Sequence, residues 1–118
     1  MRTLIVIVSS LLMAFGAGAA HAHAFLDHAS PLVGSTVRTA PQEVSLSYTQ
    51  NLEPAFSTVE VTDSGGARVD QGKAAISGNT MRIGLKTLAP GTYRVRWRAL
   101  SVDTHTTEGS FTFHVGGP

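Results

Sequence analysis

The sequence predicts an all-β protein, and three observations support this prediction. Beyond residue 22, apolar and polar side chains alternate with a period of two in several short runs, which is the pattern of strands with one buried face. Turn signals such as Ser64-Gly65-Gly66 and Pro90-Gly91 separate the runs. No segment shows a sustained helical period. A two-sheet β-sandwich is the economical architecture for strands of this kind.

Each expected strand is a run with one apolar face. The clearest, TYRVRWRAL at 92–100, directs Trp97 inward and three arginines outward. A single tryptophan at such a position is expected to pack in the core, and a row of exposed charges is expected to mark a solvated face. In chain order the expected strands cover residues 23–29, 43–49, 57–63, 67–75, 80–86, 92–100 and 109–115, of which 67–75 has the weakest pattern.

The first 22 residues have the pattern of a secretory signal peptide. Met1-Arg2 precedes an apolar run from Leu4 to Phe15, and small residues then end in Ala20-His21-Ala22. These are a basic region, a short apolar region and an A-x-A cleavage signature. The apolar run is shorter than the roughly 20 residues that cross a bilayer as a helix. We therefore expect a periplasmic protein with no membrane span in its mature chain.

The cleavage position decides which residue comes first in the mature protein. Cleavage after Ala22 gives a domain of residues 23–118 that begins with His23. A competing site, Ala17-Gly18-Ala19, also fits the signature and would leave Ala20 first.

Composition argues against several kinds of partner. The chain has 9 Lys and Arg against 8 Asp and Glu, and loss of Arg2 with the signal balances the two signs. A balanced domain gives no reason to expect nucleic acid or an anionic membrane as partner. Because the sequence has 0 cysteines, its fold cannot use disulfides, and any metal site must use nitrogen and oxygen donors.

Asp103 and His105 are the first candidates for chemistry. In an extended chain their side chains would project to the same side, about 6.5 Å apart along the strand. Burying both in a core is costly without partners, so we expect the pair at the end of the sandwich, where an ion could bridge them. The alternative is a strand-end turn in which Asp103 caps backbone amides and His105 is solvated. A hydrolytic relay with Ser101 is disfavoured because these residues lie too close in sequence.

His23 would strengthen such a site if cleavage exposes it. Its α-amine and its imidazole then offer two nitrogens in one chelate, and an amine with a reference pKa of about 7.7–8.0 loses its proton to a metal at little cost. With Asp103 and His105 the donors are three nitrogens and one oxygen, a set that suits Cu(II), although Zn(II) could also bind. Alternatively, His23 is a frayed terminus without a function.

Four runs between His23 and Val115 match one known family: HAFLDHASPLVGS, APQEVSLSYTQNLEP, LAPGTYRVRWRALS and SVDTHTTEGSFTFHV. Over this span the chain resembles the CopC family of exported copper-resistance proteins. The resemblance implies an immunoglobulin-like or cupredoxin-like Greek-key β-sandwich of about seven strands. It also implies a Cu(II) site made by the N-terminal histidine and by the aspartate and histidine of a signature S-x-D-x-H-x-x-x-G-x-x-x-F, which are His23, Asp103 and His105 here.

Three positions qualify the resemblance. Gln50 stands in YTQ where some members have a glutamate, so a carboxylate role is absent there. Met81 is the only methionine after the signal, and its strand pattern assigns it to the core, so we expect no thioether site for Cu(I). His28 is expected at the surface, with assistance to the site as the alternative.

The leading hypothesis is an exported Cu(II)-binding protein, not an enzyme, that acts in copper resistance, sequestration or delivery. Its partners would be the copper ion and a separate membrane copper transporter or copper oxidase. Two alternatives are an oxidative copper enzyme of the histidine-brace type and a metal-free sandwich used in adhesion or assembly.

Overall fold

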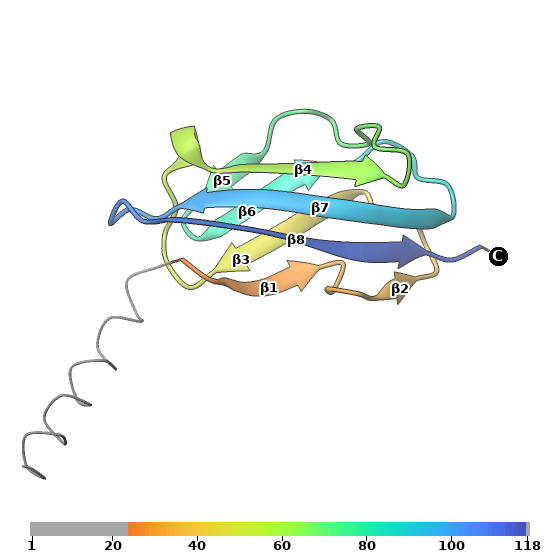
Figure 1. Cartoon of the computed structure of the whole chain (residues 1–118), viewed down its shortest axis with the longest axis horizontal. Coiled ribbons are helices and arrows are strands. Elements are labelled where there is room, and N and C mark those ends of the chain that lie inside the picture. Colours follow the sequence, from red (N-terminus) through yellow and green to blue (C-terminus); the bar gives the residue numbers. More distant parts are fainter. Residues whose placement is uncertain (1–23, 118) are drawn as a thin grey trace, which may run out of the picture.

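The computed structural model describes residues 24–117, which form two packed β-sheets (Figure 1). One sheet has the strand order β1-β3-β6-β5 and the other has the order β2-β8-β7-β4. Neighbouring strands are antiparallel, except that β2 and β8 are parallel. The strands are β1 (Leu26–Ser30), β2 (Thr36–Val37), β3 (Glu43–Tyr48), β4 (Thr58–Asp63), β5 (Ala75–Ser77), β6 (Thr80–Gly84), β7 (Gly91–Leu100) and β8 (Thr106–Val115). The fold is the expected all-β sandwich.

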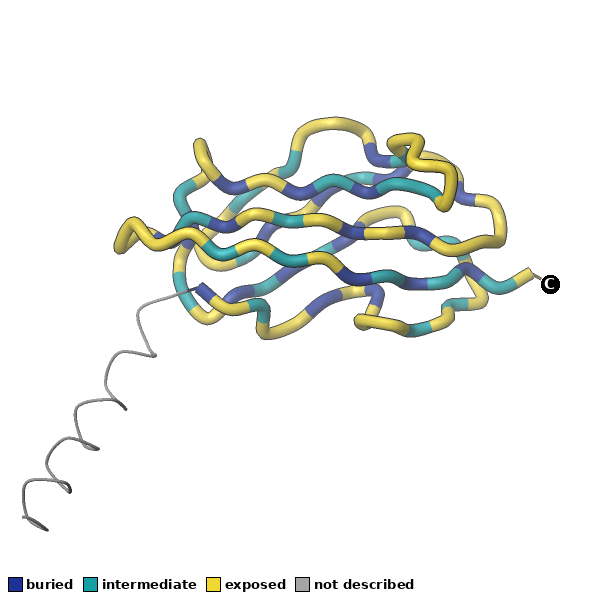
Figure 2. The backbone as a smooth tube through the Cα atoms, viewed as in Figure 1, coloured by how far each residue is buried: buried dark blue, intermediate teal, exposed yellow. Residues whose placement is uncertain are grey.

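The core consists of the alternate side chains that the period of two assigns to it (Figure 2). Burying one face of each sheet against the other removes these apolar groups from water, which is the main favourable contribution to folding. Met81 is fully buried, as its strand pattern predicts. The buried apolar residues of the longer strands are Val44, Leu46, Tyr48, Val59, Val61, Met81, Ile83, Tyr93, Val95, Ala99, Phe111, Phe113 and Val115.

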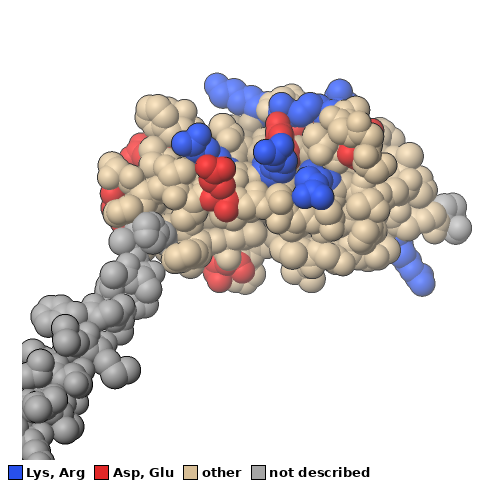
Figure 3. Space-filling view, viewed as in Figure 1, with Lys and Arg blue, Asp and Glu red and all other residues tan. Residues whose placement is uncertain are grey.

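The three arginines of β7 point outward, as expected. Arg94, Arg96 and Arg98 are exposed. On β4, Glu60 lies 3.4 Å from Arg68 and 3.8 Å from Arg96. Figure 3 shows basic and acidic side chains interspersed on this side of the molecule. Exposed ion pairs of this kind contribute little to stability, so the row is a solvated face of mixed charge.

The expected strand at 67–75 is wrong. Arg68 forms an isolated β-bridge with Thr62 of β4. Asp70 forms one with Leu85, the residue that follows β6. These partners belong to opposite sheets, so the segment crosses from one sheet to the other instead of pairing along either. Only its last residue enters a strand, at the start of β5.

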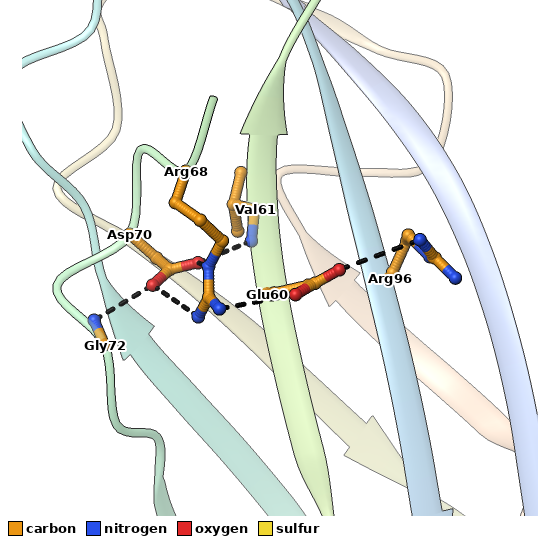
Figure 4. A network of polar contacts seen from close by, with 6 residues as sticks. All are labelled: Glu60, Val61, Arg68, Asp70, Gly72 and Arg96. Atoms are coloured by element: carbon orange, nitrogen blue, oxygen red, sulfur yellow. Dashed lines mark hydrogen bonds and ion pairs between the residues drawn. The ribbon is translucent and has the colours of Figure 1, made fainter. Parts of the chain in front are cut away.

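Asp70 holds this crossing in place (Figure 4). Its carboxylate is buried and accepts hydrogen bonds from the backbone N–H groups of Val61 at 2.7 Å and Gly72 at 2.9 Å. The Arg68 guanidinium donates to both carboxylate oxygens at 2.9 Å. Burial alone would raise the pKa of Asp70, but the bonds from Arg68, Val61 and Gly72 outweigh it and hold this pKa below its usual value.

Other strand boundaries also differ from the expectation. β2 and β5 are too short to produce a periodic signal in the sequence. β8 begins at Thr106, three residues before the expected start, because its pairing with β7 continues to Leu100↔Thr106. In the described part of the chain the helical structure is a 3₁₀ turn at Pro54–Phe56, and no helix there is long and apolar enough to cross a membrane.

Trp97 joins the two sheets and lies against Gly109. Its ring contacts Tyr48 of the opposite sheet edge to face, with centroids 5.1 Å apart. Trp97 and Gly109 are direct partners across β7 and β8. A Cβ at Gly109 would lie 2.6 Å from Trp97 Cζ2, so the missing side chain makes room for the indole.

Replacing Gly109 with alanine is expected to destabilise the protein by about 1–3 kcal/mol, the usual cost of overpacking a filled core. Urea denaturation followed by Trp97 fluorescence measures the change. Gly65→Ala is the matched control, since a Cβ there meets only Asp63 Oδ1 at an ordinary 3.5 Å. Equal stability of the Gly109 variant and the control would contradict the assigned contact.

Candidate metal site

Asp103 and His105 lie in the turn that joins β7 to β8, at one end of the sandwich. The expected position is therefore confirmed, whereas the extended backbone is wrong. Ser101 N donates to the carbonyl of His105 at 3.0 Å, and Thr104 N donates to the carbonyl of Ser101 at 2.9 Å. Thr104 has a φ of 74°, which is a left-handed conformation that a β-branched residue rarely adopts. The chain reverses here because these local bonds close a tight turn.

The turn brings the two side chains together instead of separating them along a strand. His105 Nδ1 lies 3.4 Å from Asp103 Oδ1, and the side chains are 49% and 43% exposed respectively. This separation exceeds that of an ordinary N–H···O hydrogen bond. It is close to the value of about 3 Å expected between two adjacent donors that each bind one ion at about 2.0–2.2 Å. An accessible carboxylate and imidazole at this spacing could supply two donors to one ion.

Asp103 has a pKa below its usual value. The hydrogen bond from the Ser101 hydroxyl is the main cause, and the nearby His105 lowers this pKa further. The carboxylate is therefore ionised near neutral pH and suited to a cation. The backbone N–H of His105 donates to the Ser101 hydroxyl, at 3.3 Å.

Ser101 is the residue whose part in this turn the sequence reasoning missed. It is fully buried, and its Oγ contacts Asp103 Oδ1 and the backbone of His105. The carboxylate, rather than the imidazole, faces the hydroxyl, which is the wrong order for the hydrolytic relay considered above. The spacing of Ser101 and Asp103 could have indicated this contact, since a serine in a turn often forms a hydrogen bond with a group two residues further on.

The start of the described chain is fixed beside the same turn. Thr107 Oγ1 donates to the carbonyl of Ala24 at 2.6 Å, and Ala24 is fully buried. Phe25 exchanges two hydrogen bonds of 2.9 Å with Thr49. Figure 1 shows the first described residues and the β7–β8 turn at the same end of the sandwich. His23 itself lies outside the described residues, so its proposed role as a donor is not tested.

His28, Gln50 and a further histidine, His114, do not join the pair. His28 is exposed and pairs with Asp27 at 3.0 Å, as expected for a surface residue. Gln50 is half-buried in the loop after β3. His114 lies at the far end of β8, where Nδ1 is 2.8 Å from Thr92 Oγ1. Within residues 24–117, no three His, Cys, Asp or Glu side chains gather as a complete site.

The fold is thus a small two-sheet β-sandwich that carries an accessible acid–imidazole pair on an end turn. A comparison with family models matches residues 26–116 to the CopC domain. The chain therefore belongs to the CopC family. Proteins of this family are copper-binding resistance proteins and not enzymes, so the oxidative-enzyme alternative falls away.

Individual relatives agree with this assignment. The chain is 34% identical over 122 residues to copper resistance protein C of Xanthomonas campestris pv. juglandis, covering 96% of this chain and 92% of the relative. It is 35% identical to the crystal structure of CopC from Methylosinus trichosporium OB3b, with a TM-score of 0.71 over 80% of this chain and 95% of the other. It is 33% identical to the crystal structure of PcoC, a methionine-rich copper resistance protein from Escherichia coli. That TM-score is 0.69, over 79% of this chain and 98% of the other.

Proposed function

We propose that this protein is exported, loses residues 1–22, and holds Cu(II) through the amine and imidazole of His23 together with Asp103 and His105. In this role it sequesters copper in the periplasm or delivers it to a separate membrane transporter or copper oxidase. The relatives named for copper resistance support the metal. The observation that carries the assignment to these residues is the contact between the Asp103 carboxylate and the His105 imidazole on an accessible turn.

The anchor at Ala24 supports a contribution from His23. Ala24 is hydrogen-bonded to Thr107, which is two residues from His105. Because consecutive Cα atoms are about 3.8 Å apart, the residue before Ala24 starts within reach of the turn. A histidine at that position needs no long excursion of the chain to bring its donors to the pair.

The donor types support Cu(II) as the ion. Nitrogen and carboxylate oxygen without thiolate suit Cu(II), which also binds such donors more tightly than the other first-row divalent ions do. Met81, the one methionine among the described residues, is fully buried. The described residues thus offer no accessible thioether of the kind that selects Cu(I).

His105→Ala tests the proposal in the processed protein. We expect a Cu(II) competition titration to show about 100-fold weaker binding, because loss of a ligand should cost at least as much as loss of a residue that orients one. His114→Ala is the matched control, since it removes a histidine from the far end of β8, the strand that follows the turn. Circular dichroism checks that both variants fold. Equal Cu(II) affinities in the two variants would refute the assigned site.

A further inference from the structure

The turn that carries Asp103 and His105 is organised around one buried hydroxyl. Ser101 is 0% exposed. Its Oγ contacts Asp103 Oδ1 and lies 3.2 Å from the carbonyl oxygen and 3.3 Å from the amide nitrogen of His105. A single side chain thus contacts the carboxylate of one proposed ligand and the backbone of the other.

We propose that Ser101 is a positioning residue for copper: without contacting the ion, it fixes the Asp103 carboxylate beside the His105 imidazole before the ion arrives. This inference rests on the proposed function and identifies the residue that orients a ligand of the site before the ion binds. It concerns a residue behind the donors, so it can fail while the donors themselves are correctly assigned.

The need for such a residue follows from the exposure of the pair. Side chains that are 43% and 49% exposed sample several rotamers, and ordering them for an ion costs conformational entropy. A hydrogen bond from a hydroxyl to a carboxylate is charge-assisted and therefore stronger than one between neutral groups. Ser101 can hold Asp103 because its own position is fixed by burial and by backbone bonds to the turn.

The backbone bonds of the turn limit the damage that loss of this hydroxyl would cause. Ser101 N donates to His105 O at 3.0 Å, and Val102 N donates to Asn51 O at 3.1 Å. Neither bond involves the hydroxyl. In Ser101→Ala the turn should therefore close as before, while Asp103 loses the bond that orients it.

Ser57 provides a matched control. It is also buried, at 5% exposure, and its Oγ accepts a 3.1 Å hydrogen bond from Leu100 N, the residue before Ser101. Ser57→Ala therefore removes a buried hydroxyl whose hydrogen bonds go to Leu100 and not to Asp103.

The experiment is a Cu(II) competition titration of the processed wild type, Ser101→Ala, Ser57→Ala, Asp103→Ala and the double variant Ser101→Ala/Asp103→Ala. We expect Ser101→Ala to weaken binding by about 10–100-fold, as removal of an orienting partner does in other metal sites. Ser57→Ala should bind as the wild type does. In the Asp103→Ala background, loss of Ser101 should have no further effect, because the residue acts through that carboxylate. Cu(II) electron paramagnetic resonance should change in Ser101→Ala but not in Ser57→Ala.

The outcomes separate the two proposals. Wild-type binding that is unaltered in Ser101→Ala overturns the role of Ser101 and leaves the proposed function intact. An equal loss with and without Asp103 also overturns it, since a general structural effect does not depend on the carboxylate. Failure of the wild type to bind Cu(II) overturns both proposals.

Discussion

Acetylation of the α-amine of the processed protein is expected to weaken Cu(II) binding by more than about 1,000-fold. The proposed chelate needs the amine and the imidazole of His23 together, and an acetylated amine is an amide nitrogen that no longer offers its lone pair. The loss should exceed the 10–100-fold typical of orienting partners, because a donor and its chelate ring are removed at once. A competition titration against a chelator of known Cu(II) affinity measures the difference.

The control for this experiment carries acetyl groups on the exposed Lys73 and Lys86 but has a free α-amine. It should bind Cu(II) as the unmodified protein does. Direct sequencing of the exported protein should find His23 as its first residue. If α-acetylated and unmodified proteins bind alike, the amine is not a donor, and the proposed chelate at His23 is wrong.

Asp70→Ala is expected to lower the free energy of unfolding by about 3 kcal/mol at pH 7. Removing one member of a buried ion pair usually costs about 3–5 kcal/mol. We expect the lower value because the Arg68 side chain is 51% exposed and can be hydrated, whereas the Asp70 side chain is 1% exposed. Two backbone N–H groups, of Val61 and Gly72, also lose their acceptor. Urea denaturation measures the change.

Asp63→Ala is the matched control for Asp70. The Asp63 carboxylate also accepts from two backbone N–H groups, of Gly65 at 3.0 Å and Ala67 at 2.9 Å, but in an exposed turn. Water can replace that acceptor, so the loss should be about 1 kcal/mol. Similar losses in the two variants would contradict the role assigned to the Asp70 network.

The effect of Asp70 should depend on pH in a defined direction. The folded-state pKa of Asp70 is lowered, so its contribution is complete above the unfolded pKa of about 3.9 and is lost as pH falls through the folded value. The stability difference between the wild type and Asp70→Ala should therefore be constant from about pH 5 to 7 and narrow below about pH 4.

The sequence predicts those parts of this fold that depend on local periodicity. β3, β4, β6, β7 and β8 each bury alternate residues, so a period of two suffices to find them. The segment at 67–75 has a similar pattern but is not a strand, because Asp70 draws its backbone partners from β4 and from the loop after itself. Bonds of this kind depend on which segments meet in space, and a local pattern does not contain that information.

The sequence also predicts only some features of the candidate site. Residue types and spacing make Asp103 and His105 candidates and place them at the end of the sandwich, but their assignment as ligands depends on the family resemblance. Their 3.4 Å contact depends on the left-handed backbone at Thr104, and a threonine in the sequence does not predict this conformation. The anchor of Ala24 by Thr107 links residues 83 positions apart, so the sequence alone gives no sign of it.

That anchor has a consequence for a chain without cysteines. Thr107 lies in β8, the last strand, and Ala24 lies two residues before β1, the first strand, so the bond between them spans 83 positions. An ion held jointly by the terminus and by the β7–β8 turn would close this span as a reversible cross-link. In the chain-entropy description a covalent link around a loop of this size stabilises a fold by about 4–5 kcal/mol. Copper would then act as a reversible cross-link. Its binding would raise the free energy of unfolding of the whole domain, and its release would lower it again.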